Sequence, residues 1–329
     1  MTLHPAVAAC RRGVRAVLSG LEPGDVVLVA CSGGADSLAL ASATVFEGHK
    51  LGLRVIGATV DHGLQAGSAD QAARVVAQLA AIGVDETATV RVEVTAEGLG
   101  PEAAARQARY DVLEQLREHA GAALVLLGHT RDDQAETVLL GLARGSGGRS
   151  LAGMRRSYDR YARPLLDVTR DDTFTACQVE GLEPWHDPHN DDPGYTRVRV
   201  RRTVLPVLEE HLGPGVAAAL ARTADQVRDD VEALDAIAQA AYAALRGPDG
   251  TGGIPLRALH DHYRAVASRV LRLAALEAGA IDSELAHLHV RALVDLAAGE
   301  IRGEVRLPGH VTAYRADGHL RFRPTPMTS

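Results

Sequence analysis

A repeated alternation of apolar runs and helical stretches over the first 145 residues is the feature that most constrains this chain. The runs at 26–30 and 123–127 are continuously apolar, as in buried parallel strands, and 53–60 and 89–94 also have strand character. Helical stretches follow at about 37–46, from Ser68, at 101–119 and at 130–143. Strands separated by helices predict an α/β fold with a doubly wound, mainly parallel sheet.

The pattern changes twice along the rest of the chain. Loops rich in Gly, Arg, Pro and Asp follow residue 145, with one helix near 170–180. Helical periodicity then dominates 216–246, 256–278 and 283–298, and the strand-like alternation returns at 304–323. We therefore expect two domains: an α/β domain at 1–212 that includes the arginine-rich loops, and a smaller, mainly helical domain at 213–329.

Composition excludes several classes of protein. Of the 329 residues, 46% are hydrophobic and 23% charged, which is ordinary for a globular protein. The chain has neither an apolar run of about 18 residues nor the apolar core of a signal peptide, so we expect a cytoplasmic protein without a membrane span. The three cysteines, Cys10, Cys31 and Cys177, form no CxxC pair. That spacing argues against disulfide frameworks, zinc ribbons and cysteine-held iron–sulfur clusters.

The strongest local motif is Ser-Gly-Gly-Ala-Asp-Ser at 32–37, between a buried strand and a helix. Adjacent glycines let the backbone approach an anion, and amides at a helix N-terminus point toward it. An aspartate suits such a site when a divalent cation bridges it to the phosphates. The motif is neither a Walker loop nor GxGxxG. A plain capped turn explains it less well than a phosphate loop made of Ser32, Gly33, Gly34, Ala35, Asp36 and Ser37.

Polar residues follow two other predicted strands. Asp61 and His62 end the second strand, and His129 follows the fourth. Strand ends in a doubly wound sheet line the ligand crevice, so we expect these three residues near bound nucleotide. For Asp61 and His62 a simple polar turn is an equal alternative, and His129 could instead satisfy a backbone group.

Two helical pairs stand beside the same crevice. Asp133 and Glu136 are three residues apart on one helix face, where two carboxylates could hold a metal ion or the ammonium of an amine nucleophile. Acids in a first helical turn also favour the helix dipole and serve as caps. Arg106 and Arg109 share another helix face and could neutralise pyrophosphate or hold an RNA backbone. Alternatively, these two arginines simply form a solvated helix face.

The motifs together resemble a known family. The phosphate loop resembles the PP-loop of ATP pyrophosphatases, which cleave ATP between the α- and β-phosphates. From residue 26 to 206 the order of motifs resembles tRNA(Ile)-lysidine synthetases: SGGADS, DHGL, EAAARQARY, GHTRDDQAETVLL, RGSGG, LAGM, RPLL, DPHN and RVRVR. Two positions depart from the family pattern. Val198 replaces a common asparagine, and Ser150 replaces a frequent glycine.

The resemblance implies a two-step ligation. ATP adenylates C2 of the cytidine at the first anticodon position of an isoleucine tRNA (CAU), releasing pyrophosphate, and free L-lysine then displaces AMP to form lysidine. The loop, Asp61, His62 and His129 would bind ATP, with Asp36 on Mg²⁺. Arg106 and Arg109 would face the phosphates or the intermediate, and Asp133 and Glu136 would orient lysine. No residue stands out as the base that takes lysine's proton.

The net charge of −7 argues against a nucleic-acid partner, but the arginines are clustered. Six lie between 144 and 163 with a single acid, and four lie between 197 and 202 with none. Given the resemblance, candidate contacts to tRNA are Arg144, Arg149, Arg197, Arg199 and Arg201. Solvated or ion-paired arginines are the alternative. Other functions that remain open are a PP-loop tRNA thiolase, an ATP-dependent amide ligase, and a non-catalytic nucleotide- or RNA-binding module.

Overall fold

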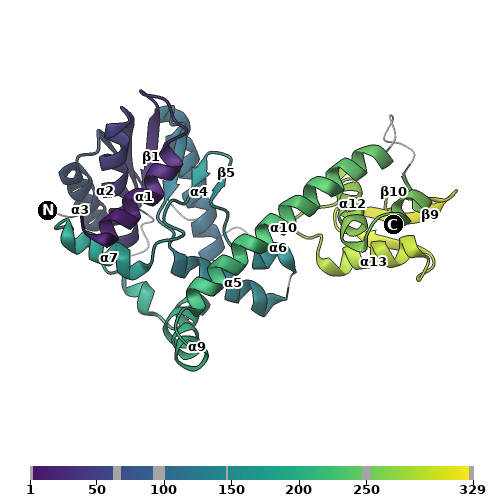
Figure 1. Ribbon diagram of the computed structural model, residues 1–329. Helices are drawn as coiled ribbons and strands as arrows, with labels where there is room; N and C mark the ends of the chain where they lie inside the picture. Colours follow the sequence, from purple (N-terminus) through teal and green to yellow (C-terminus); the bar gives the residue numbers. More distant parts are fainter. Residues whose placement is uncertain (1–2, 62–67, 92–100, 146, 247–252, 326–329) are drawn as a thin grey trace. The chain divides into compact units, whose positions relative to one another are not determined.

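The computed structural model describes residues 3–61, 68–91, 101–145, 147–246 and 253–325 (Figure 1). These residues divide into two compact units. Unit 1 comprises 1–143 and 153–224, and unit 2 comprises 144–152 and 225–329. The boundary expected at 212 falls inside unit 1, because helix α10 (Val216–Leu245) begins in unit 1 and ends in unit 2.

Unit 1 is built on a six-stranded sheet in the order β3-β2-β1-β4-β6-β5. All pairs are parallel except β5 with β6. The strands are β1 (Val26–Ala30), β2 (Arg54–Asp61), β3 (Glu86–Arg91), β4 (Leu124–Leu127), β5 (Ser157–Tyr158) and β6 (Tyr161–Ala162). The predicted doubly wound sheet is therefore confirmed. The third strand begins earlier than predicted, because Glu86 already pairs with Ile56 of β2.

Helices cover both faces of this sheet. One face packs against α1 (Pro5–Leu18), α2 (Ala35–Lys50), α3 (Ser68–Ile82) and α7 (Arg170–Val179). The other packs against α4 (Pro101–Ala120), and Figure 1 shows α4 on the opposite side of β1 from α1 and α2. Alternating side chains of β1 serve both faces, with Val27 and Val29 on the first and Leu28 on the second. Burial on both faces explains the continuous apolar run.

The strand order creates a topological switch point at the carboxyl end of β1. This strand pairs with β2 on one side and β4 on the other, so the connections after β1 and β4 leave in opposite directions. Such a switch point is where open α/β sheets bind ligands. Gly128, just after β4, packs so closely that a Cβ there would lie 3.1 Å from backbone atoms of Asp36 and Ser37. The fold thus brings the two predicted motifs into contact.

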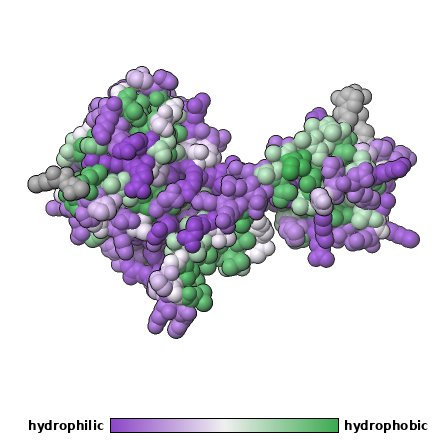
Figure 2. Space-filling view, in the orientation of Figure 1, coloured by the Kyte–Doolittle hydropathy of each residue, from purple (hydrophilic) through white to green (hydrophobic). Residues whose placement is uncertain are grey.

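The remaining helices of unit 1 follow the sheet. They are α5 (Arg131–Arg144), a 3₁₀ turn η1 (Pro188–Asp191), α8 (Thr196–Arg199), a π-helical turn η2 (Val200–Val204) and α9 (Leu205–Leu212). Ala135 of α5 packs against Val200 and Leu205 in a small apolar cluster. Val204, Val207 and Leu212 are exposed on and beside α9, where Figure 2 shows hydrophobic surface.

Unit 2 combines helices with a small antiparallel sheet in the order β7-β10-β9-β8. Its elements besides α10 are α6 (Gly148–Leu151), β7 (Ile254–Pro255), α11 (Leu256–His260), α12 (Arg264–Glu277), α13 (His287–Ala298), β8 (Glu304–Leu307), β9 (Val311–Ala316) and β10 (His319–Pro324). The predicted helix at 256–278 is split in two by a turn at 261–263. Among the described residues, no helix is long and apolar enough to span a membrane.

Truncating the α4 face of the core should destabilise unit 1. Leu113 is completely buried there, so Leu113→Ala should cost about 2–5 kcal/mol of unfolding free energy. Leu142→Ala, at a side chain that is 59% exposed in the same unit, should change it by no more than about 0.5 kcal/mol. Urea unfolding followed by fluorescence of Trp185, the single tryptophan, measures both. Equal effects of the two substitutions would contradict this packing.

Candidate active site

The loop after β1 has the geometry of an anion-binding turn. Gly33 has a φ of +85°, and Gly34 is the N-cap residue of α2 in an extended conformation. The Ser37 hydroxyl donates to the Gly34 carbonyl at 2.9 Å and accepts from the Ser32 amide at 3.2 Å. The backbone amides of the first turn of α2 follow this loop directly, and amides at a helix N-terminus favour the binding of an anion.

Gly33 is fixed from two sides. Its carbonyl accepts a hydrogen bond from the Trp185 amide at 2.9 Å. A Cβ at this position would lie 2.6 Å from Cγ2 of Val75, which is buried on α3, and 3.0 Å from Nε2 of Gln71. Both the left-handed φ and the close packing therefore require glycine here.

Asp36, in the first turn of α2, reaches toward α7. Its Oδ1 accepts a hydrogen bond from the Thr173 hydroxyl, and its Oδ2 lies 3.9 Å from Nε of Arg170. Burial raises the pKa of this carboxyl to about 6, although Thr173 and Arg170 act in the opposite direction. A single carboxylate beside a phosphate loop fits Mg²⁺, which proteins hold through one or two carboxylates together with substrate phosphates.

Glu136 on α5 is the centre of a buried ionic cluster. Its side chain has no exposed surface, and three guanidiniums surround it. Nε of Arg197 lies 2.7 Å from Oε2, Nε of Arg201 lies 2.7 Å from Oε1, and a terminal nitrogen of Arg170 lies 3.3 Å from Oε1. With Asp133, these residues form what we call the carboxylate–arginine cluster.

Asp133 uses its two oxygens differently. Oδ2 accepts from the amide and the hydroxyl of Thr130, at 2.8 and 3.0 Å, and so caps the start of α5. Oδ1 faces the cluster, 3.0 Å from Arg170 and 3.5 Å from Arg197 and Arg201. Burial would raise the pKa of this carboxyl, but the charges of Arg170 and Arg197 outweigh it and hold the pKa below its usual value. Capping and membership of the cluster are thus compatible roles.

Local structure explains how the arginines reach these acids. Arg197 and Arg201 are four residues apart across α8 and η2, on one side of the helical stretch. Val198 and Val200 between them are buried. The valine that departs from the family pattern therefore packs in the interior. Widened π turns of this kind are frequent at functional sites.

Arg170 connects the cluster to the phosphate loop. It is the first residue of α7 and lies between Thr169 and Asp172, which form the capping box of this helix. Its amide donates to Asp132 at 2.9 Å, while its guanidinium contacts Asp133 and Glu136 and approaches Asp36. Arg170 and Thr173 were not among the predicted site residues. The capping box could have located the helix start, but its position beside Asp36 depends on tertiary packing.

His129 is held by a residue that sequence reasoning did not assign to the site. Nε of Arg163 donates to Nδ1 of His129 at 3.2 Å. Burial lowers the pKa of His129 to about 4, and the charges of Arg163, Arg197 and Arg106 act in the same direction. The imidazole is therefore neutral at physiological pH.

The other predicted site residues are not part of the carboxylate–arginine cluster as the structure describes it. Arg106 and Arg109 are exposed on α4, and among the described residues neither pairs with Asp133 or Glu136. The guanidinium of Arg106 lies 5.6 Å from the centroid of the Tyr110 ring. Asp61 ends β2 as predicted, but its side chain and all of His62 lie outside the described residues.

The arginines expected to contact RNA differ in their surroundings. Arg197 and Arg201 pair with Glu136 in the carboxylate–arginine cluster, which is the ion-paired alternative for these two residues. Arg199 donates to the carbonyls of residues 193 and 194, at 2.7 and 2.9 Å. Arg149 pairs with Asp235 at 2.9 Å within unit 2, and Arg144 is exposed.

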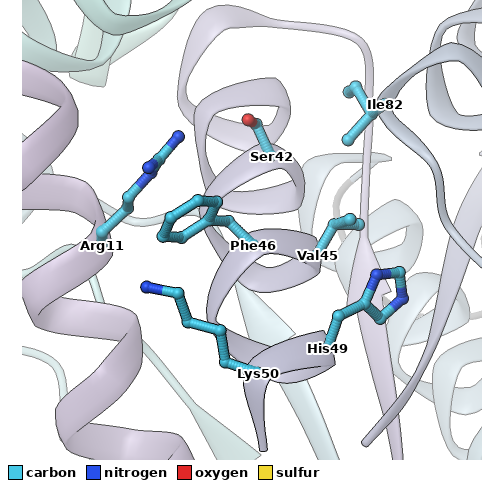
Figure 3. Close-up of a pocket in the computed structure, with 7 residues that line it drawn as sticks. All are labelled: Arg11, Ser42, Val45, Phe46, His49, Lys50 and Ile82. Atoms are coloured by element: carbon cyan, nitrogen blue, oxygen red, sulfur yellow. The ribbon is translucent and has the colours of Figure 1, made fainter. Parts of the chain in front are cut away.

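A pocket of about 490 Å³ lies at the opposite end of α2 from the phosphate loop (Figure 3). It contains none of the predicted site residues. Its lining is Arg11, Ser42, Val45, Phe46, His49, Lys50 and Ile82.

The three cysteines are all buried and free. Burial raises the pKa of Cys10 and of Cys177 to about 12 and also raises that of Cys31, so all three are thiols at neutral pH. Within the described residues, no group of three or more His, Cys, Asp or Glu side chains is arranged to hold a metal ion. The site offers no reactive thiolate of the kind that a thiolase with a catalytic cysteine would use.

Comparison with known proteins shows the family to which the chain belongs. Residues 10–208 match the family model of the PP-loop domain. The chain is 54% identical to the tRNA(Ile)-lysidine synthase of Thermobifida fusca, over 96% of this chain and 97% of that protein. It is 49% identical to the Streptomyces coelicolor tRNA(Ile)-lysidine synthase, over 97% and 99% of the two chains.

A solved structure supports the fold. The U34-tRNA thiolase NcsA from Methanococcus maripaludis, with its 4Fe–4S cluster, superimposes with a TM-score of 0.57 at 19% identity. The likeness covers 68% of this chain and 79% of that one.

Substituting Gly33 should disable the phosphate loop. Gly33→Ala places a Cβ against Val75 in a left-handed conformation, so it should cost about 1–3 kcal/mol of stability and weaken ATP binding at least about tenfold. Gly20→Ala, in a turn where a Cβ meets nothing within 4 Å, is the matched control. Titration calorimetry with ATP measures the affinity. Unchanged binding in Gly33→Ala would contradict the assignment of the loop.

The raised pKa of Asp36 predicts how stability depends on pH. An acid with a higher pKa in the folded chain than in the unfolded chain destabilises the fold as it ionises, here between about pH 4 and about pH 6. Asp36→Asn removes this cost. Its unfolding free energy relative to wild type should therefore increase by about 1 kcal/mol between about pH 5 and about pH 7.

Urea unfolding at both pH values tests this prediction. Asp167→Asn, at a side chain that is 75% exposed, is the control. A constant difference between Asp36→Asn and wild type across this range would show that Asp36 does not titrate there.

Proposed function

Because the chain belongs to the tRNA(Ile)-lysidine synthase family, we propose that it joins L-lysine to C2 of a cytidine in an isoleucine tRNA. The cytidine is the first anticodon residue of the CAU-reading tRNA, and the product is lysidine. Membership of the PP-loop family implies ATP as a substrate. One observation carries the proposal: Arg170 contacts Asp133 and Glu136 of the carboxylate–arginine cluster and also lies 3.9 Å from Asp36 of the phosphate loop.

The first step would be adenylation of the base. The O2 oxygen of cytidine attacks the α-phosphorus of ATP, the bond from that phosphorus to the bridging oxygen breaks, and pyrophosphate leaves. Residues 32–37 would hold the phosphates through backbone amides and hydroxyls, and Asp36 would hold Mg²⁺. Bound Mg²⁺ would stabilise negative charge on the leaving group. Arg106 and Arg109, on the exposed side of α4, would face the phosphates.

The second step would be attack by lysine. The ammonium would first lose a proton to water. The neutral side-chain amine then forms a bond to C2, the bond from C2 to the adenylated oxygen breaks, and AMP leaves. Free lysine is an ammonium at neutral pH, since its pKa is near 10.4. Asp133 and Glu136 would bind that ammonium and orient it toward C2.

The arginines make this binding conditional. Asp36, Asp133 and Glu136 carry three negative charges, and Arg170, Arg197 and Arg201 carry three positive charges, so the group is neutral without substrate. A lysine ammonium added there would meet carboxylates that already have partners. ATP brings phosphates that compete for the guanidiniums. ATP would therefore release carboxylate oxygens for lysine.

The exposed arginines would bind the tRNA backbone. Arg144, Arg149 and Arg199 are exposed and would take this role, whereas Arg197 and Arg201 pair with the buried Glu136. Contacts to phosphates predict an affinity that falls with salt. The target base must leave the anticodon stack to be modified, at a cost of about a few kcal/mol.

Mass spectrometry of the product tests the reaction. Incubation with the CAU isoleucine tRNA transcript, ATP, Mg²⁺ and labelled lysine should give a cytidine nucleoside that carries lysine. Asp36→Ala should abolish the product, and a variant with all three cysteines replaced by serine should retain it. Pyrophosphate release without this nucleoside would reject lysine as the nucleophile. Loss of the product in a folded cysteine-free protein would show that a cysteine takes part in the reaction, which the three buried thiols do not predict.

Lysine binding should depend on ATP. Calorimetric titration with lysine should give an affinity about 5–150-fold higher in the presence of a non-hydrolysable ATP analogue, the usual range for coupled sites. Norleucine, which has the same carbon chain but lacks the side-chain ammonium, is the control and should show no such gain in affinity. Equal lysine affinities with and without the analogue would contradict the exchange of partners in the cluster.

A further inference from the structure

Arg163 is a buried cation held by neutral groups. Arg163 is only 5% exposed, and among the described residues no carboxylate pairs with its guanidinium. One terminal nitrogen donates to the carbonyl of Arg155 at 2.7 Å, and the other approaches the hydroxyls of Tyr110 and Tyr158 at 3.3 and 3.5 Å. Nε donates to Nδ1 of His129 at 3.2 Å.

The sheet determines where this guanidinium lies. Ala162 of β6 pairs with Leu126 of β4, so Arg163 follows β6 beside the point where β4 leads into His129. The amide of Arg163 donates to the Arg156 carbonyl at 2.7 Å. The Tyr161 ring stacks on Tyr158 and meets Tyr110 edge-on, at centroid distances of 5.3 and 5.5 Å. The packed tyrosine rings and the backbone hydrogen bond therefore hold the guanidinium of Arg163 in place beside the imidazole of His129.

Only one neutral tautomer of His129 is compatible with this contact. A guanidinium has only donors, so Nδ1 of His129 must present its lone pair, and the proton of the neutral imidazole must be on Nε2. We infer that Arg163 is a positioning residue that fixes His129 as the neutral Nε2–H tautomer. His129 then serves as a hydrogen-bond donor to a substrate oxygen and is not the base that takes lysine's proton. The second part of this inference rests on the proposed function.

The charges around the imidazole agree with this assignment. Of the groups that act on His129, Asp133 favours its protonated form, whereas Arg163, Arg197 and Arg106 oppose it. Protonation at Nδ1 would also direct an N–H group at the guanidinium of Arg163. A fixed donor in a buried site stabilises an oxygen that gains negative charge, such as a phosphoryl oxygen or the adenylated O2.

Nitrogen NMR tests the tautomer without any substrate. In full-length protein with nitrogen-15 histidine, one of the 14 imidazoles is assigned to His129 by its loss in His129→Gln. The Nε2–H pattern should persist unchanged from about pH 6 to about pH 8. Arg163→Lys, which keeps a cationic donor, should preserve it, and Arg163→Met should give a mixture of tautomers. An Nδ1–H pattern or an imidazolium in the wild type would overturn the inference.

Kinetics test the donor role. The amide nitrogen of glutamine can replace Nε2–H but cannot act as a base, so His129→Gln should retain activity within about tenfold. His129→Leu, which lacks a donor, should lose about 10²–10³-fold in kcat. His119→Gln, at an exposed residue of α4, is the matched control. If folded, ATP-binding His129→Gln were as inactive as His129→Leu, the donor role would be wrong.

The two tests also separate this inference from the proposed function. If the wild type makes no lysidine but shows the Nε2–H tautomer, the role of Arg163 stands and the proposed function fails. If lysidine forms but the tautomer is Nδ1–H, the opposite holds.

Discussion

The buried carboxylate of Glu136 is the interaction on which unit 1 depends. Three segments far apart in the chain meet there: α5 with Glu136 itself, α7 with Arg170, and the α8–η2 stretch with Arg197 and Arg201. A buried carboxylate without partners would be strongly destabilising, so these segments must pack together for the chain to fold. The same requirement places the guanidinium of Arg170 beside Asp36 of the phosphate loop.

This arrangement joins stability and function in one set of groups. The acids that we propose to bind lysine are paired with arginines, and the phosphates of ATP would compete for those arginines. The exchange would be local, because the Asp36 turn and the start of α5 are in contact through Gly128 at the switch point between β1 and β4. Arg163 adds a second feature to the site, since its hydrogen bond to Nδ1 determines the hydrogen-bonding role of His129 just after β4.

Local sequence predicted the parts of the site that local structure determines. The phosphate loop could be read from Ser32 to Ser37, and Asp133 and Glu136 from their spacing on one helix face, because turn and helix geometry fix these relations. The positions of Arg170, Thr173 and Arg163 could not be read in this way, since each depends on how distant elements pack. Arg197 and Arg201 show the same limit: their clustering suggested contacts to RNA and left ion pairs open, and only the packing around the buried valines shows that they pair with Glu136.

A structure of the protein with a non-hydrolysable ATP analogue and lysine would decide what the carboxylate–arginine cluster does. We expect the side-chain ammonium of lysine within hydrogen-bonding distance of Glu136 or Asp133, and at least one guanidinium of the cluster moved to the phosphates. If all three guanidiniums remained on Glu136 while lysine bound elsewhere, the cluster would be purely structural and would not bind the substrate.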